Sequence, residues 1–182
     1  MESVRAVSEG TLPSELKRDE RLVSGAPVSK HPRRRAPRRA PLEGDAVRLE
    51  PLEPTKHAAD LFRAGHDGEA ARGLWTHMPY GPFDEDRTFD EWLRACAAFD
   101  DPLFFAVREK PASRAAGMAS YLNIRPSDGV LEIGHVWFGP ALQRTRAATE
   151  ALYLLIREAF DELGCRRLEW KCDALNAASR AA

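Results

Sequence analysis

The sequence lacks the features that would mark a membrane protein, a secreted protein or a metalloprotein. No apolar run approaches the ~20 residues of a membrane-spanning helix, and the N-terminus has no apolar signal core. The three cysteines, Cys96, Cys165 and Cys172, have no paired spacing, and no Cys/His cluster has zinc-ligand spacing. We therefore expect reduced thiols in a cytoplasmic protein without a metal.

The first 41 residues have few large apolar side chains and no aromatic residue. They carry a net charge of +5, whereas residues 42–182 carry −6. This composition predicts a disordered basic arm over 1–41 and one folded domain over 42–182. The arginines of the arm are explained by a solvated tail or by an extension from a misplaced start codon. Alternatively, residues 30–39 make a weak electrostatic contact with RNA or the ribosome, although no aromatic side chain is available to stack on bases.

From residue 42 onward the hydrophobic pattern predicts the element order β-α-α-β-β-β-α-β-α, in which the short helix within 68–83 is not counted. Three antiparallel strands joined by short turns precede a right-handed strand–helix–strand crossover, so the predicted fold is α+β, with helices on both faces of a mixed, mostly antiparallel sheet. We expect strands over 46–54, 102–109, 116–126, 130–140 and 166–175, and helices over 55–64, within 68–83, over 84–99, over 145–163 and from 176 onward.

The stretch Gly139 to Leu155, "GPALQRTRAATEALYLL", begins the crossover helix and places two arginines at its positive end. Each cation there costs roughly 0.3–1 kcal/mol unless something compensates. A helix N-terminus also offers unpaired backbone N–H donors, and a bound polyanion would reverse the sign of the arginine contribution. On residues alone, a phosphate site competes with the plainer interpretation of an ordinary core helix.

The strings "EIGHVWFGPALQRTRAATEA" and "NAASR", together with the element order, resemble the GNAT acetyltransferase superfamily, and within it the ribosomal-protein-alanine N-acetyltransferase-like branch. The pyrophosphate loop of that family reads Gln/Arg-x-x-Gly-x-Gly/Ala. Gln143 and Ala148 match this pattern, whereas Arg146 stands in place of a glycine. The resemblance implies an acyl-CoA N-acyltransferase fold that binds acetyl-CoA and transfers its acetyl group directly to an amine.

The resemblance also implies which residues bind acetyl-CoA. Backbone N–H groups would hold the pyrophosphate, main-chain groups of the preceding strand would pair with the pantetheine arm, and Phe138 N–H would stabilise the oxyanion. Asn176, with Ser179 as a weaker companion, would bond the pantetheine or the acetyl region; a plain helix cap is the alternative for Asn176. The cofactor-binding residues so implied are Val136, Phe138, Gln143, Arg144, Thr145, Arg146, Ala147, Ala148, Asn176 and Ser179.

Two residues of the strand over 130–140 are candidates for the catalytic base. Alternation places Glu132 on one face with Val136 and Phe138, and a carboxylate among apolar neighbours suits proton abstraction; an ion pair with a neighbouring strand is the alternative. His135 points to the opposite face unless Gly134 marks a bulge, and it is otherwise a packed histidine.

The acceptor amine would bind beside Trp75, Tyr80 and Phe83, for which helix packing is the alternative. The acid tyrosine of many family members would fall at position 183, and the terminal strand pair of the family is also missing. We therefore expect a C-terminally truncated, poorly active chain, or a homodimer that completes the sheet. Cys172 alternates with Leu168 and Trp170, so we expect it in the core. The competing interpretation is a non-catalytic CoA- or RNA-binding remnant.

Overall fold

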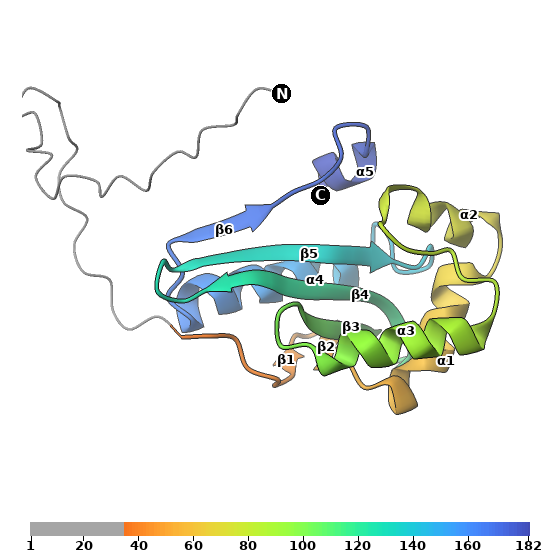
Figure 1. Cartoon of the computed structure of the whole chain (residues 1–182), viewed down its shortest axis with the longest axis horizontal. Helices are drawn as coiled ribbons and strands as arrows, with labels where there is room; N and C mark the ends of the chain where they lie inside the picture. Colours follow the sequence, from red (N-terminus) through yellow and green to blue (C-terminus); the bar gives the residue numbers. More distant parts are fainter. Residues whose placement is uncertain (1–34) are drawn as a thin grey trace, which may run out of the picture. The chain divides into compact units, whose positions relative to one another are not determined.

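The computed structural model describes residues 35–182 and shows one six-stranded sheet in the order β1-β2-β3-β4-β5-β6 (Figure 1). All neighbours are antiparallel except β5 and β6, which are parallel. The strands are β1 (Leu42–Glu43), β2 (Val47–Pro51), β3 (Leu103–Glu109), β4 (Ala115–Arg125), β5 (Val130–Phe138) and β6 (Arg167–Trp170). The predicted mixed, mostly antiparallel sheet is confirmed, and the short β1 was missed.

Helices cover both faces of this sheet, as predicted. They are α1 (Pro54–His66), α2 (Glu69–Arg72), the 3-10 turn η1 (Gly73–His77), α3 (Asp86–Ala98), α4 (Arg146–Arg157), its π-helical continuation η2 (Glu158–Glu162), and α5 (Ala177–Ala181). Gly164 follows η2 with φ of 70°, so it ends the crossover helix in the left-handed conformation that glycine adopts easily. Helix α4 lies behind the sheet in Figure 1, and α1 and α3 lie in front of it.

Two apolar cores hold these layers together. The core between the sheet and α4 contains Tyr121 and Leu155, whose backbone carbonyl accepts a 2.6 Å hydrogen bond from the Tyr121 hydroxyl. The core between the sheet and α1/α3 contains Phe89, Met118 and Trp137, all at most 3% exposed. Burial of each such large apolar side chain contributes about 1.5–3 kcal/mol, so the strands between the cores are fixed from both sides.

The last residues of the predicted arm contact the domain. Arg35 N–H donates to the Leu163 carbonyl oxygen at 3.0 Å, and Arg39 pairs with Asp100 at 3.0 Å. Residues 1–34, with most of the predicted disordered arm and part of the predicted RNA contact at 30–39, lie outside the described residues. Within 35–182, none of the helices combines the length and apolarity needed to cross a membrane.

The final strand is shorter than predicted. The predicted strand covers 166–175, whereas β6 covers only Arg167–Trp170. Cys172 lies beyond its end and is exposed. The prediction that Cys172 lies in the core is therefore wrong. Alternation places a side chain on one face of a strand, but it buries that side chain only where another layer covers the face, and the chain has left the sheet at this point.

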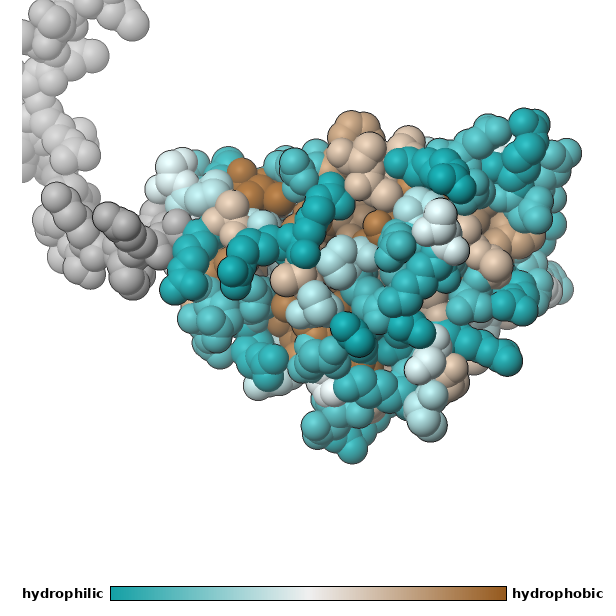
Figure 2. Space-filling model, turned by 90° about the horizontal axis from the view of Figure 1, so that it is seen from below, coloured by the Kyte–Doolittle hydropathy of each residue, from teal (hydrophilic) through white to brown (hydrophobic). Residues whose placement is uncertain are grey.

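On the face shown in Figure 2, hydrophilic side chains dominate and hydrophobic atoms form only small separate areas. Scattered apolar atoms of this kind are normal for a protein surface. This face therefore carries no broad apolar patch that would indicate the site, and the candidate functional residues lie where β5 and β6 separate.

Candidate active site

The two parallel strands β5 and β6 form a fork. They pair at four positions only, from Val130–Arg167 to Ile133–Trp170. Beyond Ile133, β5 continues to Phe138, while β6 leaves the sheet toward α5 (Figure 1). The second half of β5 therefore has no β6 neighbour, which leaves room for an extended ligand to pair with its main chain.

A β-bulge lies on β5 where the fork opens. Ser120 pairs with Gly134 and Met118 with Trp137, so three steps on β5 oppose two on β4. His135 takes the extra position with φ of 51°, in the left-handed region. The bulge thereby changes the direction of β5 where β5 and β6 separate.

This bulge corrects the predicted alternation. Val136 and Phe138 pack on the α4 side, whereas Glu132 faces the α1/α3 side, because its neighbours Leu131 and Ile133 belong to the α4 core. His135 contacts the ring of Phe104 from the α1/α3 core, so the bulge places it on the same face as Glu132. The prediction that Glu132 shares a face with Val136 and Phe138 is wrong, and the bulge left open at Gly134 is present.

Glu132 is buried, with 6% of the residue exposed, and its carboxylate has two polar partners. Asn123 Nδ2 donates to Oε2 at 2.7 Å, and the Lys171 ammonium donates to the same oxygen. The Lys171 ammonium also lies 3.0 Å from Glu169 Oε2. The ion pair expected as the alternative role of Glu132 is thus present, and a lysine just past β6 makes it.

His135 and Tyr80 lie together, although 55 residues separate them in sequence. The Tyr80 hydroxyl is 2.9 Å from His135 Nδ1, and the rings stack with centroids 5.7 Å apart. Burial lowers the pKa of His135 despite the nearby Glu132 carboxylate, so the imidazole is neutral at neutral pH. A neutral imidazole can accept a proton, and the contact with Tyr80 fixes the orientation of the ring.

The predicted acceptor wall consists of two half-buried aromatic residues and one buried one. Tyr80 and Phe83 are half-buried, whereas Trp75 is 3% exposed and donates its indole N–H to the Gly65 carbonyl oxygen at 2.8 Å. Trp75 therefore lies behind the wall as packing. His66, which the sequence analysis missed, accepts a 3.0 Å hydrogen bond at Nε2 from Phe83 N–H and holds this loop on α1.

The loop before α4 is ordered by its own side chains. Thr145 is the N-cap: its hydroxyl oxygen accepts from Ala148 N–H at 3.2 Å and its hydroxyl donates to the Leu142 carbonyl. Gln143 Nε2 donates to the Phe138 carbonyl at 2.9 Å, which joins the loop to β5. Arg144 has φ of 59° and is exposed.

The two arginines of this loop differ in their surroundings. Arg146 pairs with Asp45 of the β1–β2 turn at 3.1 Å, and both side chains are mostly exposed. The Asp45 carboxylate compensates part of the positive charge at the start of α4. The Glu150 carboxylate compensates more of it, and it also accepts hydrogen bonds from the backbone N–H groups of Asp45, Ala46 and Val47. Ala147 and Ala148 are buried, so the first turn of the helix packs its small side chains into the core between α4 and the sheet.

Asn176 and Ser179 lie at the end of the fork, on α5. The Asn176 side chain accepts from Ser179 N–H at 3.0 Å, so it is the N-cap of α5 as the plainer interpretation expected. The Ser179 hydroxyl accepts the indole N–H of Trp170 at 3.0 Å. The second bond joins the short helix to the end of β6, which borders the fork.

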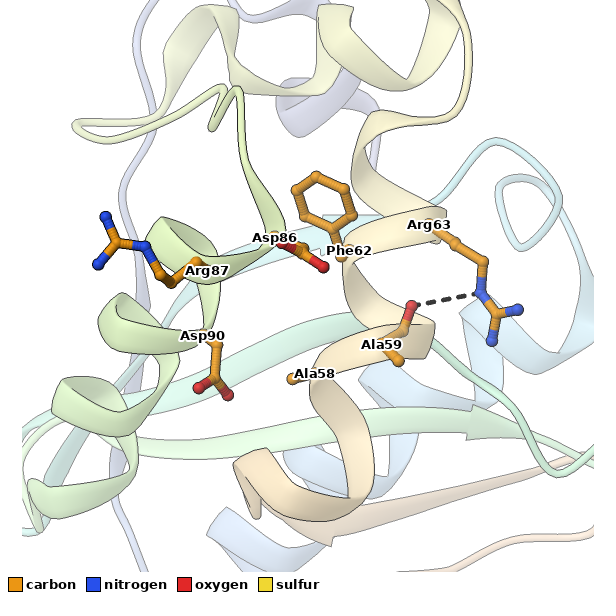
Figure 3. Close-up of a pocket in the computed structure, with 7 residues that line it drawn as sticks. All are labelled: Ala58, Ala59, Phe62, Arg63, Asp86, Arg87 and Asp90. Atoms are coloured by element: carbon orange, nitrogen blue, oxygen red, sulfur yellow. Dashed lines mark hydrogen bonds between the residues drawn. The ribbon is translucent and has the colours of Figure 1, made fainter.

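A groove of about 620 Å³ between α1 and α3 is a separate feature (Figure 3). Three of its four charged side chains are already engaged: Arg63 with Asp60, Asp90 with Arg94, and Arg87 with Glu91. It contains none of the predicted site residues, being lined by Ala58, Ala59, Phe62, Arg63, Asp86, Arg87 and Asp90. Within the described residues, no group of three His, Cys, Asp or Glu side chains is arranged to hold a metal ion.

Comparison with known proteins agrees with this geometry. A GCN5-related N-acetyltransferase from Brucella melitensis is 41% identical, with TM-score 0.80 over 84% of this chain and 68% of its own. A probable acetyltransferase of the GNAT family from Chromobacterium violaceum ATCC 12472 is also 41% identical, with TM-score 0.78 over 88% and 79%. The Microcin C7 self immunity acetyltransferase MccE, solved in complex with acetyl-CoA and AMP, shares the fold at 20% identity, with TM-score 0.65 over 76% of each chain.

A search of curated protein sequences found no significant match. The sequence profile of the family described as "Acetyltransferase (GNAT) domain" matches residues 46–182, which is most of the chain. Together with the six-stranded sheet and its fork, this match identifies the chain as a member of the GNAT acetyltransferase family.

Proposed function

We propose that the chain transfers an acetyl group from acetyl-CoA to a primary amine by direct attack, without a covalent enzyme intermediate. The observation that carries this proposal is the fork between β5 and β6, with a bulge at its opening and the start of α4 beyond Phe138. A long, thin ligand with a polyanionic end suits such a channel, because main chain lines its middle and a helix N-terminus lies at its far end.

In this proposal, the loop from Gln143 to Ala148 binds the pyrophosphate. The N–H groups of Arg146 and Ala147 are available at the first turn, whereas Ala148 N–H is already used by Thr145. The Arg144 side chain adds charge at the exposed side. Val136 and Phe138 pair with the pantetheine arm, and Phe138 N–H is the proposed oxyanion donor. Asn176 and Ser179 close the opposite side of the channel.

The amine must lose a proton before it can attack the thioester. Glu132 is the proposed base, because it is buried on the acceptor side of the sheet and faces the place where the strands part. His135 is the second candidate, held by Tyr80 in the wall that includes Phe83. The acceptor is a protein N-terminus, as in the ribosomal-protein-alanine branch, or a small-molecule amine; the place of action is the cytoplasm.

The alternative is a non-catalytic remnant that binds CoA, or RNA through residues 30–39. The favoured proposal is supported by the neutral His135 and the buried Glu132 lying on one face, since a binding remnant has no need of either. A homodimer that covers β6 remains a further proposal, which sedimentation of the purified chain would test.

Two measurements test the proposed function. Calorimetry should detect acetyl-CoA binding, and a thiol-release assay should detect CoA production over a panel of N-terminal peptides, polyamines and amino acids. Binding without turnover on any amine would favour the remnant. Absence of acetyl-CoA binding, with RNA binding that disappears when residues 1–41 are deleted, would overturn the proposal.

A further inference from the structure

Lys171 places a primary amine of the chain itself on the proposed catalytic base. It follows Trp170 directly, one residue past the last pair of β5 with β6. Its ammonium bonds Glu132, whose side chain is 8% exposed, while the Lys171 side chain is itself 63% exposed. The nitrogen is therefore held at the opening of the fork and remains accessible from solvent.

The same residues meet the geometric requirement for an activated nucleophile. Such a pair consists of a nucleophile and a base within hydrogen-bonding distance, with a third group that orients the base. Here Lys171 is the amine, Glu132 is the base, and Asn123 fixes the carboxylate through its 2.7 Å hydrogen bond. A group tethered in this way has a high effective concentration and needs no binding step.

We propose that Lys171 is an acetyl acceptor, so that the chain acetylates itself in cis at this Nζ. This inference rests on the proposed function of the fork. The ammonium gives one proton to Glu132, and the freed electron pair attacks the thioester carbonyl carbon. The N–C bond forms, the C–S bond breaks with its electron pair going to sulfur, and the second proton released by nitrogen converts the thiolate to CoA thiol.

The charges around Lys171 set the pH dependence of this reaction. Hydrogen bonds to Glu132 and then Glu169 raise the pKa of the Lys171 ammonium above its usual value. The other charged groups nearby are Arg125 of β4 and Arg167 of β6, which both face Glu169. The free amine is thus a minor species at neutral pH, so self-acetylation should be slow there and accelerate as pH rises.

Acetylation would also change the site. The amide product carries no charge and can no longer pair with Glu132 and Glu169. Both carboxylates then become available to the ammonium of an external acceptor. Acetylation of Lys171 would therefore leave Glu132 free to act as the base for an external amine.

The chain supplies a matched control in Lys56. Its ammonium also bonds a buried carboxylate, that of Glu50, and its side chain is 44% exposed. Glu50 lies on β2, three strands away from β5, so Lys56 has the same kind of environment without access to the fork. Lys110, paired with Glu43 at 3.0 Å, is a second control.

The experiment incubates the full chain with acetyl-CoA and quantifies acetylation of each lysine by peptide mass spectrometry. We expect Lys171 to be acetylated at least tenfold faster than Lys56 and Lys110, at a rate independent of protein concentration. Lys171→Arg should keep the ion pair and leave the two controls unchanged. Glu132→Gln should slow Lys171 alone by about a hundredfold, as expected for loss of a general base.

Equal rates at the three lysines would show uncatalysed chemistry and overturn the inference, as would a rate proportional to protein concentration. Calorimetry and thermal melting on the same preparations separate the causes of a negative result. A folded chain that binds acetyl-CoA and acetylates external amines, but leaves Lys171 unmodified, overturns this inference alone. A chain that does not bind acetyl-CoA overturns the proposed function with it.

Discussion

The Tyr80 hydroxyl lies 2.9 Å from His135 Nδ1, with the two rings stacked at an interplanar angle of 18°. Burial raises the pKa of Tyr80 and lowers that of His135, so both groups are neutral and the contact is a single neutral hydrogen bond. It joins the loop before α3 to the bulge of β5. Through it, the acceptor wall and the strand that borders the fork form one unit.

Tyr80→Phe removes only the hydroxyl from this unit. A neutral hydrogen bond contributes about 1 kcal/mol, so we expect kcat/KM for an amine acceptor to fall roughly five- to tenfold. The acetyl-CoA Kd should change less than twofold. Tyr153→Phe on the exposed side of α4 is the matched control and should have no effect. If Tyr80→Phe weakens acetyl-CoA binding as much as it lowers kcat/KM for the amine, this contact supports the acetyl-CoA site rather than the acceptor site.

Glu132→Gln tests the proposed base with little change in shape. We expect kcat to fall by 10²–10⁴-fold, the usual contribution of general acid–base catalysis, with acetyl-CoA binding retained. Glu169→Gln is the control, because Glu169 contacts the same Lys171 ammonium from β6, directly across from Glu132 in the strand register. If Glu169→Gln lowers kcat as much as Glu132→Gln does, the two carboxylates act through their charge, and Glu132 has no special role as a base.

Gly117→Ala tests whether the position of β5 next to the bulge is required. A Cβ at Gly117 would lie 2.6 Å from the Trp137 carbonyl oxygen, a backbone atom that cannot move without shifting β5. We expect a loss of several °C in Tm and weaker acetyl-CoA binding, because the displaced main chain lines the fork. Gly73→Ala is the control, since nothing lies within 4 Å and its φ of −63° suits alanine. If Gly117→Ala lowers Tm but leaves the acetyl-CoA affinity unchanged, this part of β5 does not contribute to acetyl-CoA binding.

The sequence predicted the sheet, the crossover and the approximate limits of every long element, because apolar periodicity and turn residues are local signals. It did not predict which face His135 occupies. That depends on an extra residue in β5, which only pairing with β4 reveals. The position of Cys172 was wrong for a related reason, since alternation continues in sequence after the strand has left its partners. The Lys171–Glu132 pair joins residues 39 apart and has no local signal.

Arg144→Gly tests the source of affinity for acetyl-CoA at the loop before α4. Arg144 adopts φ of 59°, which costs an arginine about 1 kcal/mol that glycine avoids, so the variant should be slightly more stable. If its charge contributes to phosphate binding, the wild-type Kd should rise with added salt, and this salt dependence should be weaker in the variant. Arg157→Gly, at the far end of α4, should retain the full dependence. Identical salt slopes in all three proteins would contradict a role for Arg144.

Acid stability should depend on the buried cluster where α1 begins. Nδ1 of His57 accepts from Glu53 N–H at 3.1 Å, so its Nε2–H donates to Glu50 at 3.0 Å. Burial lowers the pKa of His57, although Glu50 opposes this. The stability that comes with neutral His57 is therefore present above about pH 6.5 and lost as pH falls through its folded pKa.

Glu50 responds at lower pH. Burial alone would raise its pKa, but hydrogen bonds from Lys56, Arg108 and His57 outweigh burial and lower it to about 2. Its stabilisation is present above pH 4.5 and lost as pH falls toward 2. We expect Tm to decline in two steps on acidification, with the upper step smaller in His57→Gln and of wild-type size in the control His77→Gln. The upper step does not vanish, because burial also lowers the pKa of His66 and of His135. Glu50→Gln should cost about 3 kcal/mol at pH 7, because it leaves the buried His57 and the mostly buried Arg108 without their anion. An upper step of wild-type size in His57→Gln would show that His57 does not contribute to it.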